Sequence, residues 1–201
     1  MHEQNNAMIQ GFVEILDPNT GEILVDKQNA IHFENFSESL AQSMANKSLG
    51  HIYQMSFGNG GTNVDPTGVI TYLPPNQTGQ SVDLYNETYM KIVDGTSPAN
   101  TDPSRNNLTV LHTNGKIYTD ILVTCLLDYG EPSGQQAFDN STDLAGEYIF
   151  DELALKTWQG DTNDARLVTH LIFHPVQKSL NRQIQINYTI RIMTMTTIQA
   201  T

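Results

Sequence analysis

The chain has 201 residues, enough for one domain with a sizeable core, and it is strongly acidic. Ten Lys and Arg residues stand against 22 Asp and Glu residues, which gives a formal net charge of −12. Such a surface repels nucleic acid phosphates, so no nucleic-acid partner is expected. Only 16% of the residues are charged, and the polar character comes largely from Asn, Gln, Ser and Thr, which suit strands, turns and polar interfaces. A mainly β protein is therefore predicted.

The N-terminus and the single cysteine bear on the compartment of the protein. Residues Met1 to Asn6 contain neither the basic segment nor the apolar stretch of a signal peptide, and no apolar run approaches the roughly 18 residues of a membrane-spanning helix. Cys125 lies among apolar neighbours and has no second cysteine to pair with. We therefore expect a protein that folds in a cytoplasm, has no membrane partner and buries Cys125 as a neutral thiol.

The first elements predicted along the chain form a hairpin. The apolar segments Phe12–Leu16 and Glu22–Val25 flank Asp17-Pro18-Asn19-Thr20-Gly21, where proline presets φ and glycine can take a left-handed conformation. A two-stranded hairpin is marginal on its own. We accordingly assign residues 1–30 to an N-terminal arm and hairpin, and residues 31–201 to one β domain.

The segment from Asn35 to Asn46 predicts one amphipathic helix. Asn35 and Glu38 have the spacing of a capping box, and Gly50 can end the segment. An apolar stripe recurs at helical spacing, and we expect it to pack on a sheet that contains Ile184, Ile186, Tyr188 and Ile190. The stripe consists of Phe36, Leu40 and Met44.

Alternating apolar and polar residues predict the strands that follow. The strand from His51 to Phe57 stops at Gly58-Asn59-Gly60-Gly61, which we interpret as a structural turn. The Asn114-Gly115 pair predicts an antiparallel pairing of the segments 108–112 and 117–127. The last strand alternates from Ile184 to Ile192, so one of its faces must be core. Together these elements predict an α+β fold dominated by an antiparallel β-sandwich with long loops.

Three long segments lack regular periodicity: 62–81, 94–107 and 131–146. Irregular segments of this length in compact domains are usually functional or disordered. Aromatic residues in or beside them, such as Tyr72, Tyr85 and Trp158, could stack on a sugar or anchor a protein interface. A carbohydrate-binding β-sandwich therefore stays open as an alternative function.

The polar residues predict no catalytic, metal or cofactor site. His170 and His174 have the spacing of a metal pair on a helix, but their segment is β-like, and residues i and i+4 of a strand lie roughly 13 Å apart. Asp151 and Glu152 are neighbours in a strand and should point to opposite faces. We expect them to hydrogen-bond loop backbone. A glycan-cleaving enzyme that uses Asp151 or Glu152 remains a further alternative.

The order of these signals resembles a phage virion module. A helix, a strand ending in Phe-Gly-Asn-Gly-Gly, a long loop, a hairpin, Asp-Glu-Leu-Ala-Leu, Leu-Val-Thr-His and an alternating last strand follow one another between Ile31 and Ile192. This is similar to the N-terminal collar or attachment domain of tailed-phage tail-fibre proteins. By position, Gly58–Gly61 match the family's glycine turn, Glu152–Leu155 match its Glu-Ile-Gly-Leu strand, and Leu167–Phe173 match the next strand. Ala154 replaces the glycine usual in that motif.

The resemblance implies a non-enzymatic virion structural protein that mediates protein–protein assembly. A collar, neck, baseplate or tail adaptor, or a capsid-decorating subunit, is expected rather than a fibre, because the sequence ends at Thr201 where a fibre would continue into a shaft. Its expected partners are other virion proteins and further copies of itself, with no small-molecule substrate. Its expected location is the virion, after synthesis and assembly in the host bacterial cytoplasm. The residues expected at interfaces are Phe12, Ile15, Ile23, Val25, Ile70, Tyr72, Leu73, Lys178 and Arg182.

Overall fold

The computed structural model describes residues 2–133 and 149–199, with the backbone alone at residues 2–6 and 195–199. In this part of the chain the fold is mainly β with one helix, as the composition and periodicity predict. Most of the predicted 131–146 loop lies outside the described residues. The elements are β1 His2–Leu16, β2 Ile23–Ile31, α1 Phe33–Met44, β3 Ile52–Gly58, β4 Thr62–Val64, β5 Ile70–Tyr72, β6 Glu87–Ile92, β7 Asn107–His112, β8 Tyr118–Leu127, β9 Ile149–Thr157, β10 Arg166–Leu167, β11 Thr169–Gln177 and β12 Ile184–Gln199.

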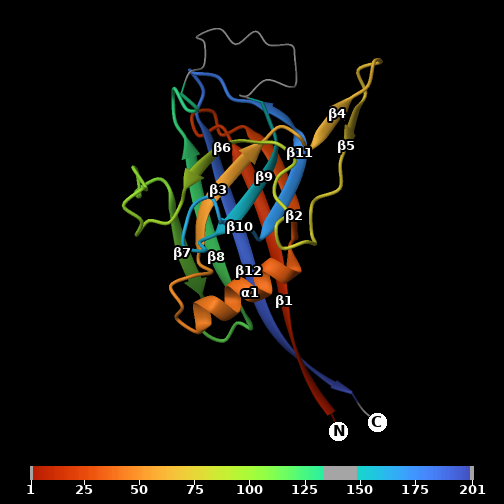
Figure 1. Cartoon of the computed structure of the whole chain (residues 1–201), viewed down its shortest axis with the longest axis vertical. Helices are drawn as coiled ribbons and strands as arrows, with labels where there is room; N and C mark the ends of the chain where they lie inside the picture. The colour runs from red at the N-terminus through yellow and green to blue at the C-terminus, as the bar shows by residue number, and fades with distance from the viewer. Residues whose placement is uncertain (1, 134–148, 200–201) are drawn as a thin grey trace.

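Ten strands form one curled antiparallel sheet in the order β6-β3-β9-β11-β2-β1-β12-β8-β7, with β10 paired on β9. The sheet curls so that its two halves face each other in a sandwich-like arrangement (Figure 1). Alternate residues of β12 fill the space between the halves and are almost fully buried: Ile184, Ile186, Tyr188 and Ile190. Cys125 belongs to the same core, and burial raises the pKa of its thiol to about 12. The predictions for the last strand and for the thiol are confirmed.

The hairpin of β1 and β2 is confirmed, but it is not a separate arm. Gly21 has a φ of +74°, and the Asp17 carboxylate accepts the amide of Asn19 at 2.9 Å, which closes the predicted turn. In the sheet β1 lies between β2 and β12, while β2 also pairs with β11. The division into residues 1–30 and 31–201 is therefore wrong, because the two strands complete the middle of a single core.

The helix α1 begins at Phe33 rather than at Asn35. His32 is the N-cap, and its Nδ1 accepts the amide N–H of Asn35 at 3.2 Å. The predicted capping box is wrong because the buried Asn35 side chain instead donates to the carbonyl of Leu167 at 2.9 Å. Phe36 is buried and Leu40 half-buried, whereas Met44 is 80% exposed. The predicted apolar stripe therefore contacts the core only in its first turns.

Residues 62–81 are less irregular than the sequence suggests, because they contain the β4–β5 hairpin. Asp65 accepts the amides of Thr67 at 2.8 Å and Val69 at 2.9 Å and so closes the turn of this hairpin. The hydroxyl of Tyr72 lies 3.2 Å from Nδ1 of His174 on β11, which anchors the base. The hairpin projects from the body of the molecule (Figure 1).

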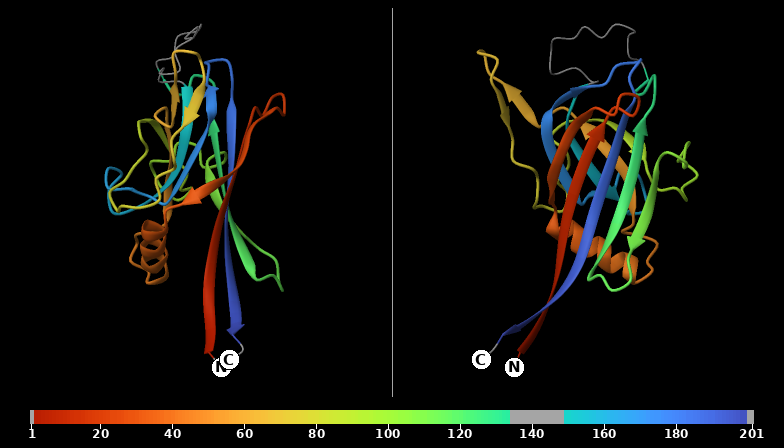
Figure 2. Two further views of the ribbon diagram at one scale, coloured as in Figure 1. Left: turned by 90° about the vertical axis from the view of Figure 1, so that its right-hand side faces the viewer. Right: turned by 180° about the vertical axis from the view of Figure 1, so that it is seen from behind.

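The ends of β1 and β12 form a second projection, which we call the terminal ribbon. β1 and β12 pair from Leu16↔Gln185 to His2↔Gln199. However, β2 pairs with β1 only from Gly11 onward, and β8 pairs with β12 only as far as Met193. The terminal ribbon consists of residues 2–10 of β1 and residues 191–199 of β12. Residues 191–193 still pair with β8, and residues 2–7 and 194–199 continue beyond the body as two paired strands that carry both termini (Figure 2). Among the described residues no helix is long and apolar enough to cross a membrane.

Candidate functional site

Two adjacent carboxylates hold the Gly58–Gly61 turn against β9. The Gly61 amide donates to Asp151 Oδ1 at 2.9 Å, and the Gly60 amide donates to Glu152 Oε1 at 3.0 Å. Both carboxylates are buried, with 1% of Asp151 and 0% of Glu152 exposed. The prediction that they bind loop backbone is confirmed. The alternation of side chains along a strand predicted only that Asp151 and Glu152 point to opposite faces. It did not predict that both reach successive backbone amides of one turn, those of Gly61 and Gly60.

Glu152 is the centre of this network, which we call the β9 carboxylate network. Its Oε1 also accepts the amide of Asn86 at 2.8 Å, and its Oε2 accepts the amide of Tyr85 at 2.9 Å. Nε2 of His170 lies 3.0 Å from Oε2, and Nδ1 of the same ring accepts the amide of Asn76 at 2.8 Å. Because Nδ1 is an acceptor, Nε2 carries the proton and donates it to Glu152. One carboxylate therefore joins the glycine turn, the loop before β6 and β11.

The two carboxyl groups of the network differ in acidity. Burial alone raises the pKa of Glu152, but the hydrogen bonds from His170 and from the amides of Asn86, Tyr85 and Gly60 bring this pKa below its usual value. Burial raises the pKa of Asp151, and the negative charge of Glu152 adds to the rise. Two neighbouring carboxyl groups whose pKa values are shifted in opposite directions are also found in acid–base active sites. Here neither carboxylate is open to a substrate, since both are buried under the loops that they bind.

The glycines of the turn are required by close approach and not by a left-handed backbone. A Cβ atom at Gly58 would lie 2.5 Å from the carbonyl oxygen of Asn86, and one at Gly60 would lie 2.7 Å from Cβ of Tyr85. At Gly61 the nearest atom, Cγ2 of Ile172, would be 3.0 Å away. The predicted structural turn of Gly58, Asn59, Gly60 and Gly61 is confirmed, and its glycines let two loops and β9 meet.

His170 and His174 lie on the same strand but have different partners. His170 is buried in the β9 carboxylate network, while His174 is exposed and contacts Tyr72 of the projecting hairpin. Across residues 2–133 and 149–199, no three His, Cys, Asp or Glu side chains are placed to hold a metal ion.

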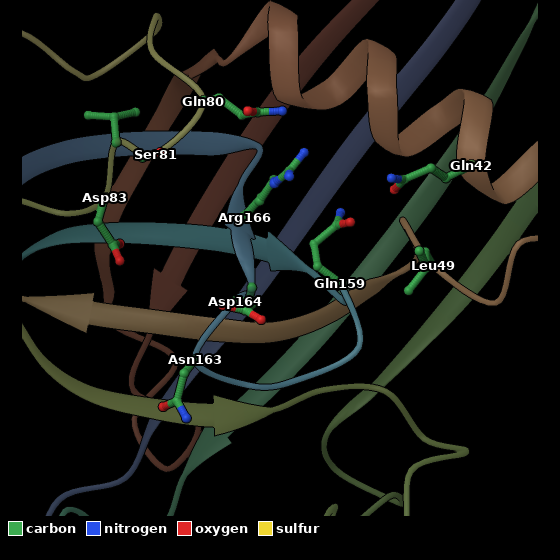
Figure 3. A pocket seen from close by; sticks show the side chains of 11 residues that line it. Gln42, Leu49, Gln80, Ser81, Asp83, Gln159, Asn163, Asp164 and Arg166 are labelled. Atoms are coloured by element: carbon green, nitrogen blue, oxygen red, sulfur yellow. The ribbon is translucent and has the colours of Figure 1, made fainter.

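A polar pocket of about 630 Å³ opens between α1, the loop before β6 and the segment between β9 and β10 (Figure 3). Gln42, Gln159 and Arg166 point into it from different sides (Figure 3). Arg166 forms an ion pair with Glu38 of α1, which also accepts the side chain of Gln80 at 3.0 Å. The pocket is lined by Gln42, Leu49, Gln80, Ser81, Val82, Asp83, Gln159, Asn163, Asp164, Ala165 and Arg166, none of which is aromatic.

A smaller, apolar cavity of about 270 Å³ lies between α1 and the strands at one end of the sheet. Phe36 and Leu40 of the helix face Val110 of β7, Ile121 of β8 and Ile192 of β12 across it. The helix packs through Phe36 and Leu40 on the sheet that contains Ile184 to Ile190, as predicted, but it covers this sheet near Ile192, and the packing leaves this space.

The residues expected at interfaces fall into three groups. Ile15, Val25 and Lys178 are buried within this chain and are not available to a partner, which corrects that part of the expectation. The reason for Ile15 and Val25 is that β1 and β2 are central strands with one face in the core. Arg182 forms ion pairs with Asp17 and Glu22. The residues with exposed surface are Phe12, Ile23 and Tyr72, with Ile70 and Leu73 partly exposed.

A scan against protein-family models finds no matching family, and searches of curated proteins and of solved structures find no match. The likeness to the phage attachment domain therefore rests on the short motifs of the sequence.

Proposed function

We propose that this chain is a non-enzymatic structural subunit of a tailed-phage virion, acting in the collar, neck, baseplate or tail adaptor, or on the capsid. Its role is to hold other virion proteins and further copies of itself. The observation that carries the proposal is the terminal ribbon, in which nine residues of β1, from His2 to Gln10, extend past the edge of β2. A two-stranded ribbon is marginal in water, so contacts with neighbouring subunits would stabilise it.

The β4–β5 hairpin supports the same role. It projects from the body, and it exposes the apolar residues Val64 and Val69 beside its turn and Tyr72 near its base. Apolar and aromatic side chains on a projecting element are typical of protein contacts. The hairpin and the residue after it contain three of the residues expected at interfaces from the sequence, Ile70, Tyr72 and Leu73.

The β9 carboxylate network supports a structural role because its polar side chains bind backbone amides of nearby loops. Asp151, Glu152 and His170 are the residues most suited to acid–base chemistry, and each is engaged with backbone amides of the loops above it. Their effect is to fix the position of the glycine turn, and thereby the base of the projecting hairpin that follows it.

The test is the composition of purified phage particles. For the phage whose genome encodes this chain, we expect its peptides in purified particles at a constant ratio to the major capsid protein, and its gene beside portal, capsid or tail genes. Hydrogen exchange should show new protection of residues 62–72 in particles relative to the isolated protein. Absence of the chain from particles that remain infectious and intact would contradict the proposal.

A second candidate, carbohydrate binding, is favoured by the polar pocket alone. Its volume is in the range of ligand pockets, and its amide, carboxylate and guanidinium groups offer the donors and acceptors that sugar hydroxyls require. The aromatic residues that suggested sugar stacking lie elsewhere: Trp158 packs on Tyr53, and the Tyr85 hydroxyl donates to the carbonyl of Pro74.

Glycan-array binding of the purified protein separates the two candidates. Binding that is lost in Asn163→Ala and retained in the matched variant Asn19→Ala would favour the carbohydrate candidate. Asn163 lines the pocket, whereas Asn19 lies in the β1–β2 turn. The structural proposal expects no glycan binding that depends on Asn163.

A further inference from the structure

The edge of β1 in the terminal ribbon is open over residues 2–10. In antiparallel register β1 pairs with β12 on one side throughout its length, but on the other side β2 joins only at Gly11↔Asn29. No other strand of the described residues pairs with β1 before that point. The opposite edge of the ribbon is shorter, and the amide of Thr194 on that edge already donates to the carbonyl of Ile117 at 3.2 Å. The β1 edge is therefore the longer row of free backbone donors and acceptors.

The sequence of the ribbon lacks the residues that keep strand edges apart. Residues 4–10, Gln-Asn-Asn-Ala-Met-Ile-Gln, and residues 192–199, Ile-Met-Thr-Met-Thr-Thr-Ile-Gln, contain no charge and no proline. Exposed edges in natural proteins are usually protected by lysine, proline or bulges. The absence of such protection indicates an edge that is paired in the working protein.

Charge decides which partner fits this edge. The chain as a whole carries a net charge of −12, so two copies repel one another over most of their surface. Apart from Glu3 and Arg191 the ribbon carries no formal charge with His neutral, so it is a place where identical subunits can approach with little of that repulsion. An identical edge also supplies the same number of donors and acceptors in complementary order when it runs antiparallel.

We propose that two copies of this chain pair through the open β1 edges of their terminal ribbons. A two-fold axis at Asn6, midway along residues 2–10, sets His2 of one copy opposite Gln10 of the other. The result is a four-stranded antiparallel sheet in the order β12-β1-β1-β12, with the two bodies at opposite ends. Three or more strands give a sheet the stability that a lone ribbon lacks. This interface deepens the proposed assembly role by naming one contact between copies.

A charge-swap experiment tests the pairing. At the two-fold axis residue 6 of one copy is the direct cross-strand partner of residue 6 of the other, and Cβ atoms of such partners lie roughly 5 Å apart, so Asn6→Lys places two positive charges together and Asn6→Glu two negative ones. We expect the unaltered protein to be a dimer by light scattering and each variant alone to be a monomer. An equimolar mixture of the two variants should form a heterodimer. The matched control Asn19→Lys, in the exposed turn of β1 and β2, should remain dimeric.

Cysteine cross-linking tests the register. Asn6→Cys should form a disulfide-linked dimer on mild oxidation, because cross-strand Cα atoms lie within the range that a disulfide spans. Met8→Cys should not, because the two cysteines would be roughly 13 Å apart along the strands. Cys125 is fully buried and does not compete. Cross-linking of Met8→Cys in place of Asn6→Cys would overturn the register.

The pairing and the proposed function fail in different ways. A protein that is monomeric at the concentrations tested, or a mixture of Asn6→Lys and Asn6→Glu that stays monomeric, overturns the pairing even if the chain is present in particles. A dimer that behaves as expected but is absent from particles overturns the virion role and leaves the pairing in place.

Discussion

Nε2 of His170 and Oε2 of Glu152 lie 3.0 Å apart in a hydrogen bond between two fully buried side chains. The bond joins β11 to β9 beneath the loops that approach the same carboxylate. The same Glu152 carboxylate and its neighbour Asp151 also accept the amides of Gly60 and Gly61. The glycine turn at residues 58–61 and the Asp-Glu pair some ninety positions later are therefore two parts of one hydrogen-bonded unit.

Glu152→Gln should destabilise the protein strongly for a change of so few atoms. A glutamine keeps one acceptor oxygen, while its amide group would face N–H donors that the carboxylate now satisfies, and each buried donor left unpaired costs about 1–3 kcal/mol. Urea unfolding measures the loss. The control Glu34→Gln, at an exposed position in the first turn of α1, should stay within about 0.5 kcal/mol. Equal stability of the two variants would show that the network contributes nothing.

Gly60→Ala should lower the free energy of unfolding by about 1–3 kcal/mol, the usual effect of forcing an atom into packed structure. The added Cβ would lie 2.7 Å from Tyr85 and 2.8 Å from the amide nitrogen of Asn86. Gly95→Ala is the matched control, because its Cβ would meet its nearest atom at 3.7 Å, an ordinary contact. Thermal melting of both variants distinguishes close approach from a general effect of replacing glycine.

Three alanine variants of α1 should rank by burial. Phe36→Ala removes a core side chain and should cost about 3–5 kcal/mol. Leu40→Ala, at a half-buried position beside the apolar cavity, should cost about 1–2 kcal/mol, since only part of its surface is removed from water. Met44→Ala should be nearly neutral because Met44 is exposed. A loss at Met44 as large as that at Phe36 would mean that a partner covers the end of the helix.

Lys178 should make a contribution to stability that rises with pH in the alkaline range. Burial lowers the pKa of Lys178 to about 8 from an ordinary value of 10.5, although Glu131 and Asp128 oppose the shift. Between these two values the unfolded chain binds a proton that the folded protein has released, so the Lys178 contribution to the free energy of unfolding increases as pH rises from about 8 to 10.5. The raised pKa of the Cys125 thiol acts in the opposite direction above its ordinary value of 9, so chemical denaturation should show the rise between about pH 8 and 9.

Lys178→Met should remove that contribution to the slope, because no amine remains to titrate. Lys116→Met, which replaces an exposed lysine in the β7–β8 turn, should keep the rise. A slope that is unchanged in Lys178→Met would place its origin in another group.

Local patterns in the sequence were sufficient for most of the strands. The alternation from Ile184 to Ile192 predicts a strand with one buried face, because successive side chains of a strand point to opposite sides. Asn114-Gly115 predicts the β7–β8 turn, in which Gly115 has a φ of +85°. Apolar neighbours predict the burial of Cys125. Each of these features depends on residues that are close together in the chain.

The tertiary structure decided the features that depend on distant residues. It placed β1 and β2 in the middle of the sheet, and it drew Asn35 away from the helix cap to the carbonyl of Leu167. It also buried Lys178, which the sequence analysis places at an interface. The sequence by itself determined most of the residues that form strands, because periodicity is local, although it missed β4, β5 and the first part of β1. It did not determine which strands become neighbours, because that depends on how the whole sheet curls to close its core.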